Sequence, residues 1–389
     1  MKKIPYATQW IDAQDIEAVK LALESSYLTQ GPLIEKFEKI VAEHCGAKYV
    51  VAVNSGTSAL HIACLAAGIK RGDEVITSPI TFVASANCIL YCGAKPIFAD
   101  VLEDTININP KEIEKKISKK TKAIIPIDFA GQPADLSEIR SIANRKNIII
   151  IEDAAHALGA KYKGEIVGSG KYADFTILSF HAVKHITTGE GGMVLTNNKD
   201  FYKKLKLFRS HGIIRDPNLL KINPEPWFYE MQALGFNYRL TDIQSALGIS
   251  QFKRLSVFIK RRKQITNEYD KVFCRYEELQ PLSIKPYIDH VHHLYILKFN
   301  LDKLSATRRE IFNEYLKYGI CVNVHYIPVY YQPYYKKIGY KKGLCLNAEK
   351  YYECSITLPL YPKMSDCDIK RVVKVTKKIV EKFKIREIF

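Results

Sequence analysis

Seven short apolar segments alternate with helical patterns, and this alternation constrains the fold of the chain more than any other feature. The segments read "YVVAVNS", "DEVITSPIT", "AKPIFADV", "KAIIPIDF", "NIIIIED", "DFTILSF" and "GGMVLT", all before residue 200. Helical patterns such as "TSALHIACLAAG" and "LSEIRSIANRKN" separate several of them. Nearly continuous apolar strands interleaved with helices are typical of a mainly parallel sheet covered on both faces. We therefore predict an α/β fold with a mainly parallel seven-stranded sheet and helices on both of its faces.

The pattern changes after about residue 250. The stretch "SQFKRLSVFIKRRKQITNEYDKVF" predicts a long amphipathic helix, "HLYILKF" and "VNVHY" predict strands, and "DCDIKRVVKVTKKIVEKF" predicts a closing helix. A chain of 389 residues is long enough for two domains. We expect a large domain over residues 1–250, which includes the N-terminal segment, and a smaller α+β domain over residues 251–389.

Several classes of protein are disfavoured by what the sequence lacks. No apolar run follows the lysines of "MKKIPYATQWIDAQD", and no run of about 18 apolar residues could cross a membrane. We therefore expect a cytoplasmic protein without a membrane partner. The nine cysteines are irregularly spaced and include no C-x-x-C pair, which favours reduced thiols over disulfides or a metal site.

The formal net charge of +17 raises the possibility of a nucleic-acid partner. However, the lysines are spread along the whole chain, and acidic or apolar residues interrupt them, as in "KEIEKKISKKTK". This spread is typical of solvated helix faces. Because no helix-turn-helix, zinc-finger or RNA-binding signature accompanies the charge, we expect no nucleic-acid binding.

Polar residues gather where the predicted strands end, which is where ligands bind in such sheets. After the first strand, "NSGTSAL" places Ser55, Gly56, Thr57 and Ser58 at the turn into a helix. The free N–H groups and the dipole of a helix N-terminus suit a phosphate. Serine and threonine are also ordinary N-cap residues, so this motif alone leaves both interpretations open.

The fifth and sixth strands end in "IIEDAAHALG" and "SFHAVKHITTGEGG". Asp153 should lie partly buried at the sheet edge, where it needs a cation or hydrogen bonds, although a helix-capping role is equally compatible. Ser179 closes the sixth strand and Lys184 follows in the loop. A lone loop lysine is usually solvated, but a phosphate site, a carboxylate and a lysine at one edge together suit pyridoxal phosphate.

Five motifs in matching order resemble the sugar aminotransferases of the DegT/DnrJ/EryC1/StrS family over essentially the whole chain. They are "NSGTSAL", "TSPITFVASAN", "EDAAHALGA", "SFHAVKHITTGEGG" and "GFNYRLTDIQSALG". The resemblance implies a fold-type-I pyridoxal phosphate-dependent transferase. The stretches "LFRSHG", "IDFAGQP" and "VHYIPVY" are similar to the pseudaminic acid branch. Its members transfer an amino group from L-glutamate to the C4 ketone of a UDP-linked 4-keto-6-deoxy-N-acetyl-L-altrosamine.

The resemblance also implies roles for individual residues. Lys184 would form the Schiff base with the cofactor, and Asp153 would pair with the ring nitrogen. Four residues would hold the phosphate, namely Ser179, Gly56, Thr57 and Ser58. Phe82 is similar to the aromatic residue that stacks on the ring. His156 would lie near the ring hydroxyl, at a position where many relatives have glutamine.

Three further residues are assigned by the same resemblance to the partner subunit and the substrate. Asn237 in "GFNYR" would reach the phosphate bound by the neighbouring subunit, which implies a homodimer with shared active sites. His325 and Tyr326 in "VNVHYIP" would lie near the bound sugar nucleotide. The flanking His181 and His185 are expected to have structural or pocket-lining roles.

Two other enzymes remain open at this point. One is an aminotransferase for another nucleotide-linked keto sugar, because the motifs do not specify the hexose or the position of its ketone. The other is a dehydratase on the same cofactor. A dehydratase branch of the family has a histidine in place of the lysine, so Lys184 favours the transaminase.

Overall fold

The large sheet of the computed structural model, which describes residues 2–222 and 225–385, has seven strands in the order β1-β9-β8-β5-β4-β2-β3. Neighbouring strands from β8 to β3 pair in parallel, whereas β9 pairs antiparallel with both β1 and β8. The predicted mainly parallel sheet is therefore confirmed. Its strands are β1 Tyr49–Val53, β2 Glu74–Thr77, β3 Lys95–Phe98, β4 Thr121–Ile125, β5 Ile149–Asp153, β8 Phe175–Ser179 and β9 Gly192–Thr196.

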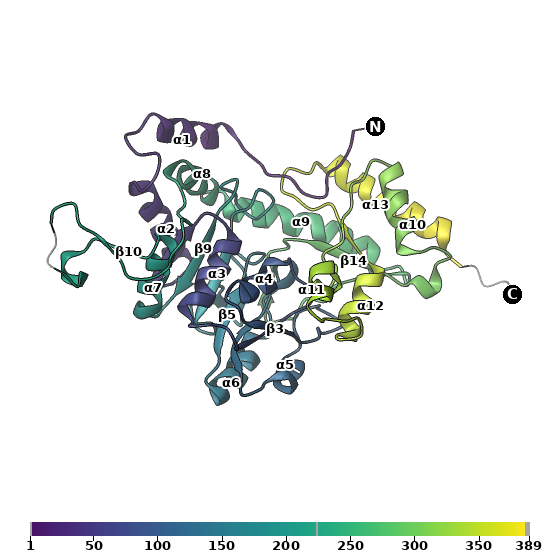
Figure 1. Ribbon diagram of the computed structural model, residues 1–389. Coiled ribbons are helices and arrows are strands. Elements are labelled where there is room, and N and C mark those ends of the chain that lie inside the picture. The colour runs from purple at the N-terminus through teal and green to yellow at the C-terminus, as the bar shows by residue number, and fades with distance from the viewer. Residues whose placement is uncertain (1, 223–224, 386–389) are drawn as a thin grey trace.

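Helices cover both faces of this sheet, as the apolar strands require (Figure 1). Successive residues of a strand point to opposite faces, and in β5 Ile151 packs in a cluster with Ile62 whereas Ile150 packs with Ile139. Six helices accompany the strands: α2 Pro32–Cys45, α3 Gly56–Ala66, α4 Ala84–Tyr91, α5 Pro110–Lys116, α6 Leu136–Lys146 and α7 Lys199–Arg209.

The C-terminal part is built on a second, antiparallel sheet in the order β12-β14-β15. Tyr269, Leu297, Tyr315 and Val372 belong to a buried cluster between this sheet and helices on one of its faces. The strands are β12 Leu279–Pro281, β14 Tyr295–Phe299 and β15 Ser355–Leu358. The helices are α9 Leu255–Phe273, α10 Arg308–Lys317, α11 Pro333–Lys337, α12 Leu346–Cys354 and α13 Asp366–Phe383. The domain boundary at residue 250 stays a prediction.

Short strands complete the described residues. β6 Lys161–Tyr162, β7 Glu165–Ile166 and β13 Ile288–Asp289 form a small sheet. β10 Ile213–Ile214 pairs with β11 Glu230–Met231, and the hairpin that they frame projects from the body of the molecule (Figure 1). No helix among the described residues is long and apolar enough to cross a membrane.

Two predicted elements differ from the structure. The long helix expected from Ser250 is interrupted, because α8 Asp242–Phe252 ends before Arg254, whose φ of −104° and ψ of 4° leave the helical region. The stretch "VNVHY" is not a strand, since only Asn323 pairs with a neighbour, Thr357. The chain then leaves the sheet and brings His325 and Tyr326 to the cleft described below.

The N-terminal segment crosses from the C-terminal sheet to α1 Ala13–Leu23. Ile4 is buried in the C-terminal cluster, donates to the carbonyl of Gly319 at 2.9 Å and accepts from the N–H of Cys321 at 2.8 Å. Tyr6 then accepts from the N–H of Leu360 at 3.0 Å. The first residues of the chain are therefore held by its last third.

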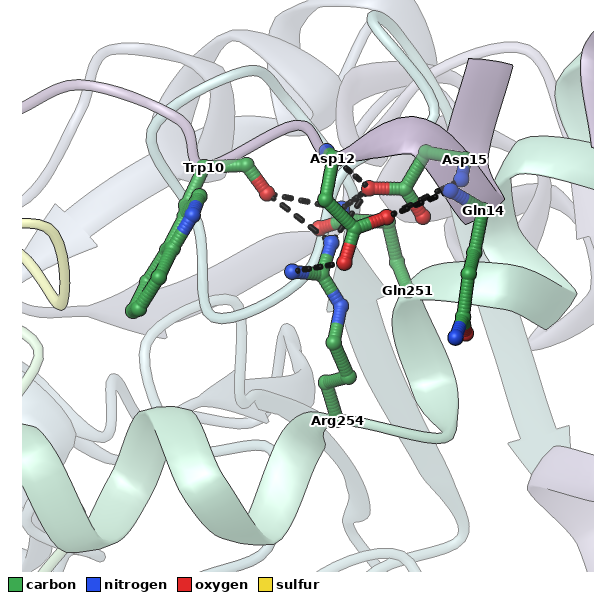
Figure 2. Close-up of polar contacts among 6 residues, drawn as sticks. All are labelled: Trp10, Asp12, Gln14, Asp15, Gln251 and Arg254. Atoms are coloured by element: carbon green, nitrogen blue, oxygen red, sulfur yellow. Dashed lines mark hydrogen bonds and ion pairs between the residues drawn. The ribbon is translucent and has the colours of Figure 1, made fainter. Parts of the chain in front are cut away.

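A charged cluster fixes the start of α1, and Figure 2 shows the Arg254 side chain directed at two aspartates. Arg254 pairs with Asp12 at 2.7 Å and with Asp15, which is fully buried. The amide of Gln251 donates to Asp15 at 2.6 Å, and the carbonyl of Trp10 accepts from both Gln251 and Arg254. We call Asp12, Asp15, Gln251 and Arg254 the N-terminal latch.

Candidate active site

A cleft of about 500 Å³ lies at the carboxyl ends of β1, β5 and β8. This edge is where chemistry is expected in a parallel sheet, because loops and helix N-termini converge there. Nine of the eleven site residues predicted from the sequence line the cleft: Gly56, Thr57, Phe82, Asp153, His156, Ser179, Lys184, His325 and Tyr326. The structure thus brings together residues that lie far apart in the chain.

One end of the cleft is suited to a phosphate. Ser55 is the N-cap of α3, and Gly56 and Thr57 follow as its first residues, whose N–H groups have no acceptor within the helix. A Cβ at Gly56 would lie 3.1 Å from the Cβ of Ser179, so glycine lets β8 and α3 approach closely here. The hydroxyl of Ser179 lies beside these groups.

Asp153 ends β5 and is 6% exposed. The hydroxyl of Ser85 donates to its Oδ2 at 2.6 Å, and the N–H of Ala155 donates to its Oδ1 at 3.2 Å. Burial raises the pKa of Asp153, although Ser85, Ala155 and the Lys184 ammonium act in the opposite direction. A cation bound against Asp153 would therefore find a carboxylate that lacks a full counter-charge.

Lys184 lies in the loop after β8, where its N–H donates to the carbonyl of His181 at 2.9 Å. Burial lowers the pKa of its amine to about 8, and Asp153 only partly offsets this effect. About a tenth of the amine is therefore neutral at pH 7, far more than for a solvated lysine. A neutral amine is the form that attacks an aldehyde.

Four buried histidines surround Lys184: His156, His185, His293 and His325. Burial lowers the pKa of each, and the positive charge of Lys184 lowers it further. All four rings are therefore neutral near pH 7. His185 contacts the carbonyl of Val291 through Nε2 at 3.2 Å, which supports the structural role predicted for it.

Phe82 stands at the mouth of the cleft and is 60% exposed, an unusual exposure for a large aromatic ring. Its centroid lies 6.4 Å from that of Tyr326. The ring has no tight packing of its own, so it is free to stack on a planar ligand. Its stacking on the cofactor ring stays a prediction.

Two predicted residues do not line the cleft. The hydroxyl of Ser58 donates to the amide oxygen of Asn54 at 2.6 Å, and its N–H donates to the side chain of Ser55, so Ser58 serves the helix cap. Asn237 pairs through its backbone with Ser210, and its carbonyl accepts from the Asn54 amide at 3.5 Å. Within one chain, Asn237 is therefore outside the cleft.

The cleft also contains residues that sequence reasoning did not assign to it. The polar ones include Tyr6, Ser85, Glu190 and His293, and His181, for which a structural or pocket-lining role was expected, also lines the cleft. Ser85 lies one helical turn after the "ITF" motif, which was a signal that could have been followed. Tyr6 and His293 come from distant segments, and no local pattern points to them.

These features fit pyridoxal phosphate. The helix N-terminus and Ser179 supply donors for a phosphate, Lys184 supplies an amine for the aldehyde, and Asp153 supplies a carboxylate for a protonated ring nitrogen. The three groups share one cavity that is large enough for a ligand of this size. In the residues that the structure describes, no group of histidine, cysteine or acidic side chains is arranged to hold a metal ion.

Comparisons with known proteins agree with this chemistry. The model of the DegT/DnrJ/EryC1/StrS aminotransferase family matches residues 9–377. The UDP-4-amino-4,6-dideoxy-N-acetyl-beta-L-altrosamine transaminase of Campylobacter jejuni is 41% identical over 385 residues, which are 98% of each chain.

Two solved structures superpose over almost the whole chain. PseC of Helicobacter pylori, an aminotransferase of pseudaminic acid biosynthesis, has a TM-score of 0.91 and 32% identity and covers 98% of this chain and 100% of its own. The PLP-form of a putative sugar aminotransferase from Streptococcus pneumoniae has a TM-score of 0.90 and 31% identity, covering 98% of this chain and 99% of its own.

Proposed function

Since this chain belongs to the DegT/DnrJ/EryC1/StrS aminotransferase family and is a pyridoxal phosphate-dependent sugar aminotransferase, we propose that it aminates a specific UDP-linked keto sugar. The acceptor is the C4 ketone of a UDP-linked 4-keto-6-deoxy-N-acetylhexosamine of pseudaminic acid biosynthesis, and the donor is L-glutamate. The observation that carries the proposal is the placement of Lys184 and Asp153 in one cleft with the N-terminus of α3. The names of the Campylobacter and Helicobacter relatives support the choice of substrate.

A few residues of the cleft have defined tasks in the proposed amino transfer. The bound cofactor supplies an electron sink for the carbanion that forms when the substrate carbon loses a proton. Lys184 binds the cofactor and, once displaced, its amine moves that proton. Asp153 keeps the ring nitrogen protonated, and the first turn of α3 with Ser179 anchors the phosphate. Phe82 covers one face of the ring.

The direct test is a reaction with a defined acceptor panel. The protein is incubated with L-glutamate and with UDP- and dTDP-linked keto sugars, and the products are identified by NMR. We expect an amino group at C4 of the UDP-linked 4-keto-6-deoxy-N-acetyl sugar. A product aminated only from a dTDP sugar, or at C3, would contradict the substrate, and loss of water without amination would contradict the transaminase.

We further propose a homodimer in which Asn237 of one subunit completes the cleft of the other. Asn237 lies outside the cleft of its own chain, although its family motif is matched. Large apolar side chains are exposed on and beside the projecting hairpin, including Trp227 at 76%, Met231 at 65% and Leu234 at 78%. An exposed apolar surface of this kind is typical of a protein–protein interface.

Mixed dimers test the shared site. Lys184→Ala and Asn237→Asp are each expected to be inactive, the second because a new carboxylate repels the cofactor phosphate. In a dimer of the two variants, one site has both defects and the other has neither. Refolding them together should therefore restore activity. If mixed dimers are verified by mass spectrometry and remain inactive, the two residues serve the same chain and the shared site is wrong.

A further inference from the structure

Two imidazole rings lie against each other, tilted, in the wall of the cleft. The centroids of His156 and His293 are 4.3 Å apart with an interplanar angle of 34°, and both side chains are at most 5% exposed. In the described part of the chain, the Nδ1 atom of each ring is buried without a hydrogen-bond partner. Buried polar atoms without partners are rare and costly, and they concentrate at functional sites.

The backbone around His293 is held firmly from both sides. Its N–H donates to the carbonyl of Ala130 at 2.8 Å, and its carbonyl accepts from Nη1 of Arg262 at 3.0 Å. Gly131 has a φ of +100°, and a Cβ there would lie 2.9 Å from the nitrogen of His293. The backbone of His293 is therefore fixed by two hydrogen bonds and by the close approach of Gly131.

The Arg262 guanidinium is part of this support. It is 1% exposed, and in the residues described it donates to the carbonyls of His292, His293 and Leu360 without pairing with a carboxylate. Burial lowers its pKa to about 10, so it still carries its charge at neutral pH. Burying a cation whose described partners are carbonyls lowers the stability of the folded protein. This cost indicates that the position of His293 is important for function.

The environment of His156 determines which nitrogen carries its hydrogen. Its Nε2 lies 3.3 Å from the hydroxyl oxygen of Tyr326, whereas its Nδ1 is buried and unpaired. A buried N–H without an acceptor is rarer than a buried acceptor without a donor. We therefore assign the neutral ring a hydrogen on Nε2. His156 then donates to Tyr326, and the hydroxyl hydrogen of Tyr326 is left for an acceptor in the cleft.

We propose that His293 is a positioning residue that holds His156 by ring stacking. His156 Nε2–H then donates to the Tyr326 oxygen, and Tyr326 O–H presents one donor to the oxygen on the cofactor ring. This inference rests on the proposed function, because it requires pyridoxal phosphate in the cleft. It differs from the roles predicted from sequence, in which Tyr326 binds only the sugar nucleotide and His293 has no role.

The consequence is spectroscopic and does not require turnover. Donors to the ring oxygen lower its basicity, so they lower the pH at which the coloured holoenzyme loses its proton. Tyr326→Phe removes one donor, and His293→Leu removes the stacking plane while filling a similar volume. We expect each to raise the pH midpoint of the visible band by about one unit. His293→Phe keeps a stacking ring without nitrogens and should leave the midpoint near that of the wild type.

Two further proteins complete the experiment. Tyr331→Phe removes a buried hydroxyl outside the cleft and should leave the midpoint unchanged. The double variant Tyr326→Phe/His293→Leu should shift no more than the larger single change, because both act through one hydrogen-bonded unit. Additive shifts in the double variant would contradict the inference.

The remaining outcomes separate the inference from the proposed function. Absence of a visible band in the wild type loaded with pyridoxal phosphate would overturn the cofactor site itself. Two outcomes with a coloured wild type would overturn only the stacking role of His293. In the first, His293→Leu leaves the pH midpoint of the visible band unchanged. In the second, His293→Phe shifts this midpoint as far as His293→Leu does.

Discussion

The N-terminal latch and the wall of the cleft both bury charged side chains, but they neutralise them differently. In the latch, the Arg254 guanidinium lies against two carboxylates, Asp12 and Asp15. In the cleft, the ammonium of Lys184 lies near one carboxylate, Asp153, and four neutral histidines, and the buried Arg262 donates to backbone carbonyls.

This difference in ion pairing distinguishes charged residues that stabilise the fold from those that act in catalysis. The latch cation has two carboxylates of its own, so its role ends with holding α1 against α8 and α9. A cluster with incomplete pairing is stable only because the surrounding fold holds it, and a ligand can complete it. Substitutions in the latch should therefore change stability, and those in the cleft should change catalysis.

The largest effect is expected from Lys184→Ala. Turnover should fall by at least about 10³-fold to 10⁴-fold, because both the covalent anchor and the proton-transfer group are lost. Denaturant unfolding of the ligand-free variant should be no worse than that of the wild type, since a buried ammonium has been removed. In the wild type, borohydride should fix the cofactor on Lys184, as peptide mapping would show. A label on another lysine would contradict the site.

Arg254→Leu should have the opposite profile. The free energy of unfolding should fall by roughly 3–5 kcal/mol, because Asp15 is left buried without a counter-charge. Turnover per folded molecule should stay close to that of the wild type. Lys271→Ala, which breaks an exposed pair with Glu268, is the control and should change stability by less than about 1 kcal/mol. If urea titrations gave the same loss of unfolding free energy for Arg254→Leu and Lys271→Ala, the N-terminal latch would be no more stabilising than an exposed ion pair, and its structural role would be wrong.

Asp153→Asn tests the cleft without changing its shape. The amide cannot keep the ring nitrogen protonated, so turnover should fall by about 10²-fold to 10³-fold while the cofactor still binds. Absorbance titration with pyridoxal phosphate measures binding, and the sugar assay measures turnover. Near-normal turnover would show that Asp153 only caps the following turn.

The smallest effect concerns pH. Because the Lys184 amine has a pKa of about 8, its neutral fraction grows about tenfold from pH 6 to pH 7 and little above pH 9. The rate at which the ligand-free protein binds pyridoxal phosphate covalently should follow this curve, as visible absorbance would record. A midpoint near that of a solvated lysine, about 10.4, would show that the cleft does not desolvate Lys184.

Local patterns predicted the sheet and the residues at its edge because strand periodicity and strand-end position are local properties. All seven predicted strands occur in one sheet, and Lys184 and Asp153 meet as the parallel arrangement requires. The helix break at Arg254 was not predicted, because Arg254 pairs with Asp12 and Asp15, which lie more than 200 residues earlier in the chain.

Residues brought in by long-range contacts could not be predicted. His293 reaches the cleft through Ala130 and Arg262, and Tyr6 reaches it through Leu360. In each case the neighbouring sequence gives no indication of the destination. The strand predicted for "VNVHY" was wrong for the same reason. Its pairing is limited to the bridge between Asn323 and Thr357, and Thr357 lies more than 30 residues away in the sequence.

The path of the N-terminal segment has a consequence for biosynthesis. Ile4 and Tyr6 are synthesised more than 300 residues before their partners Gly319, Cys321 and Leu360. The large sheet can form while translation continues, whereas the nascent N-terminal segment must wait with Ile4 exposed. Because Tyr6 and Ala7 also line the cleft, the cleft is finished only after residue 360 has emerged from the exit tunnel.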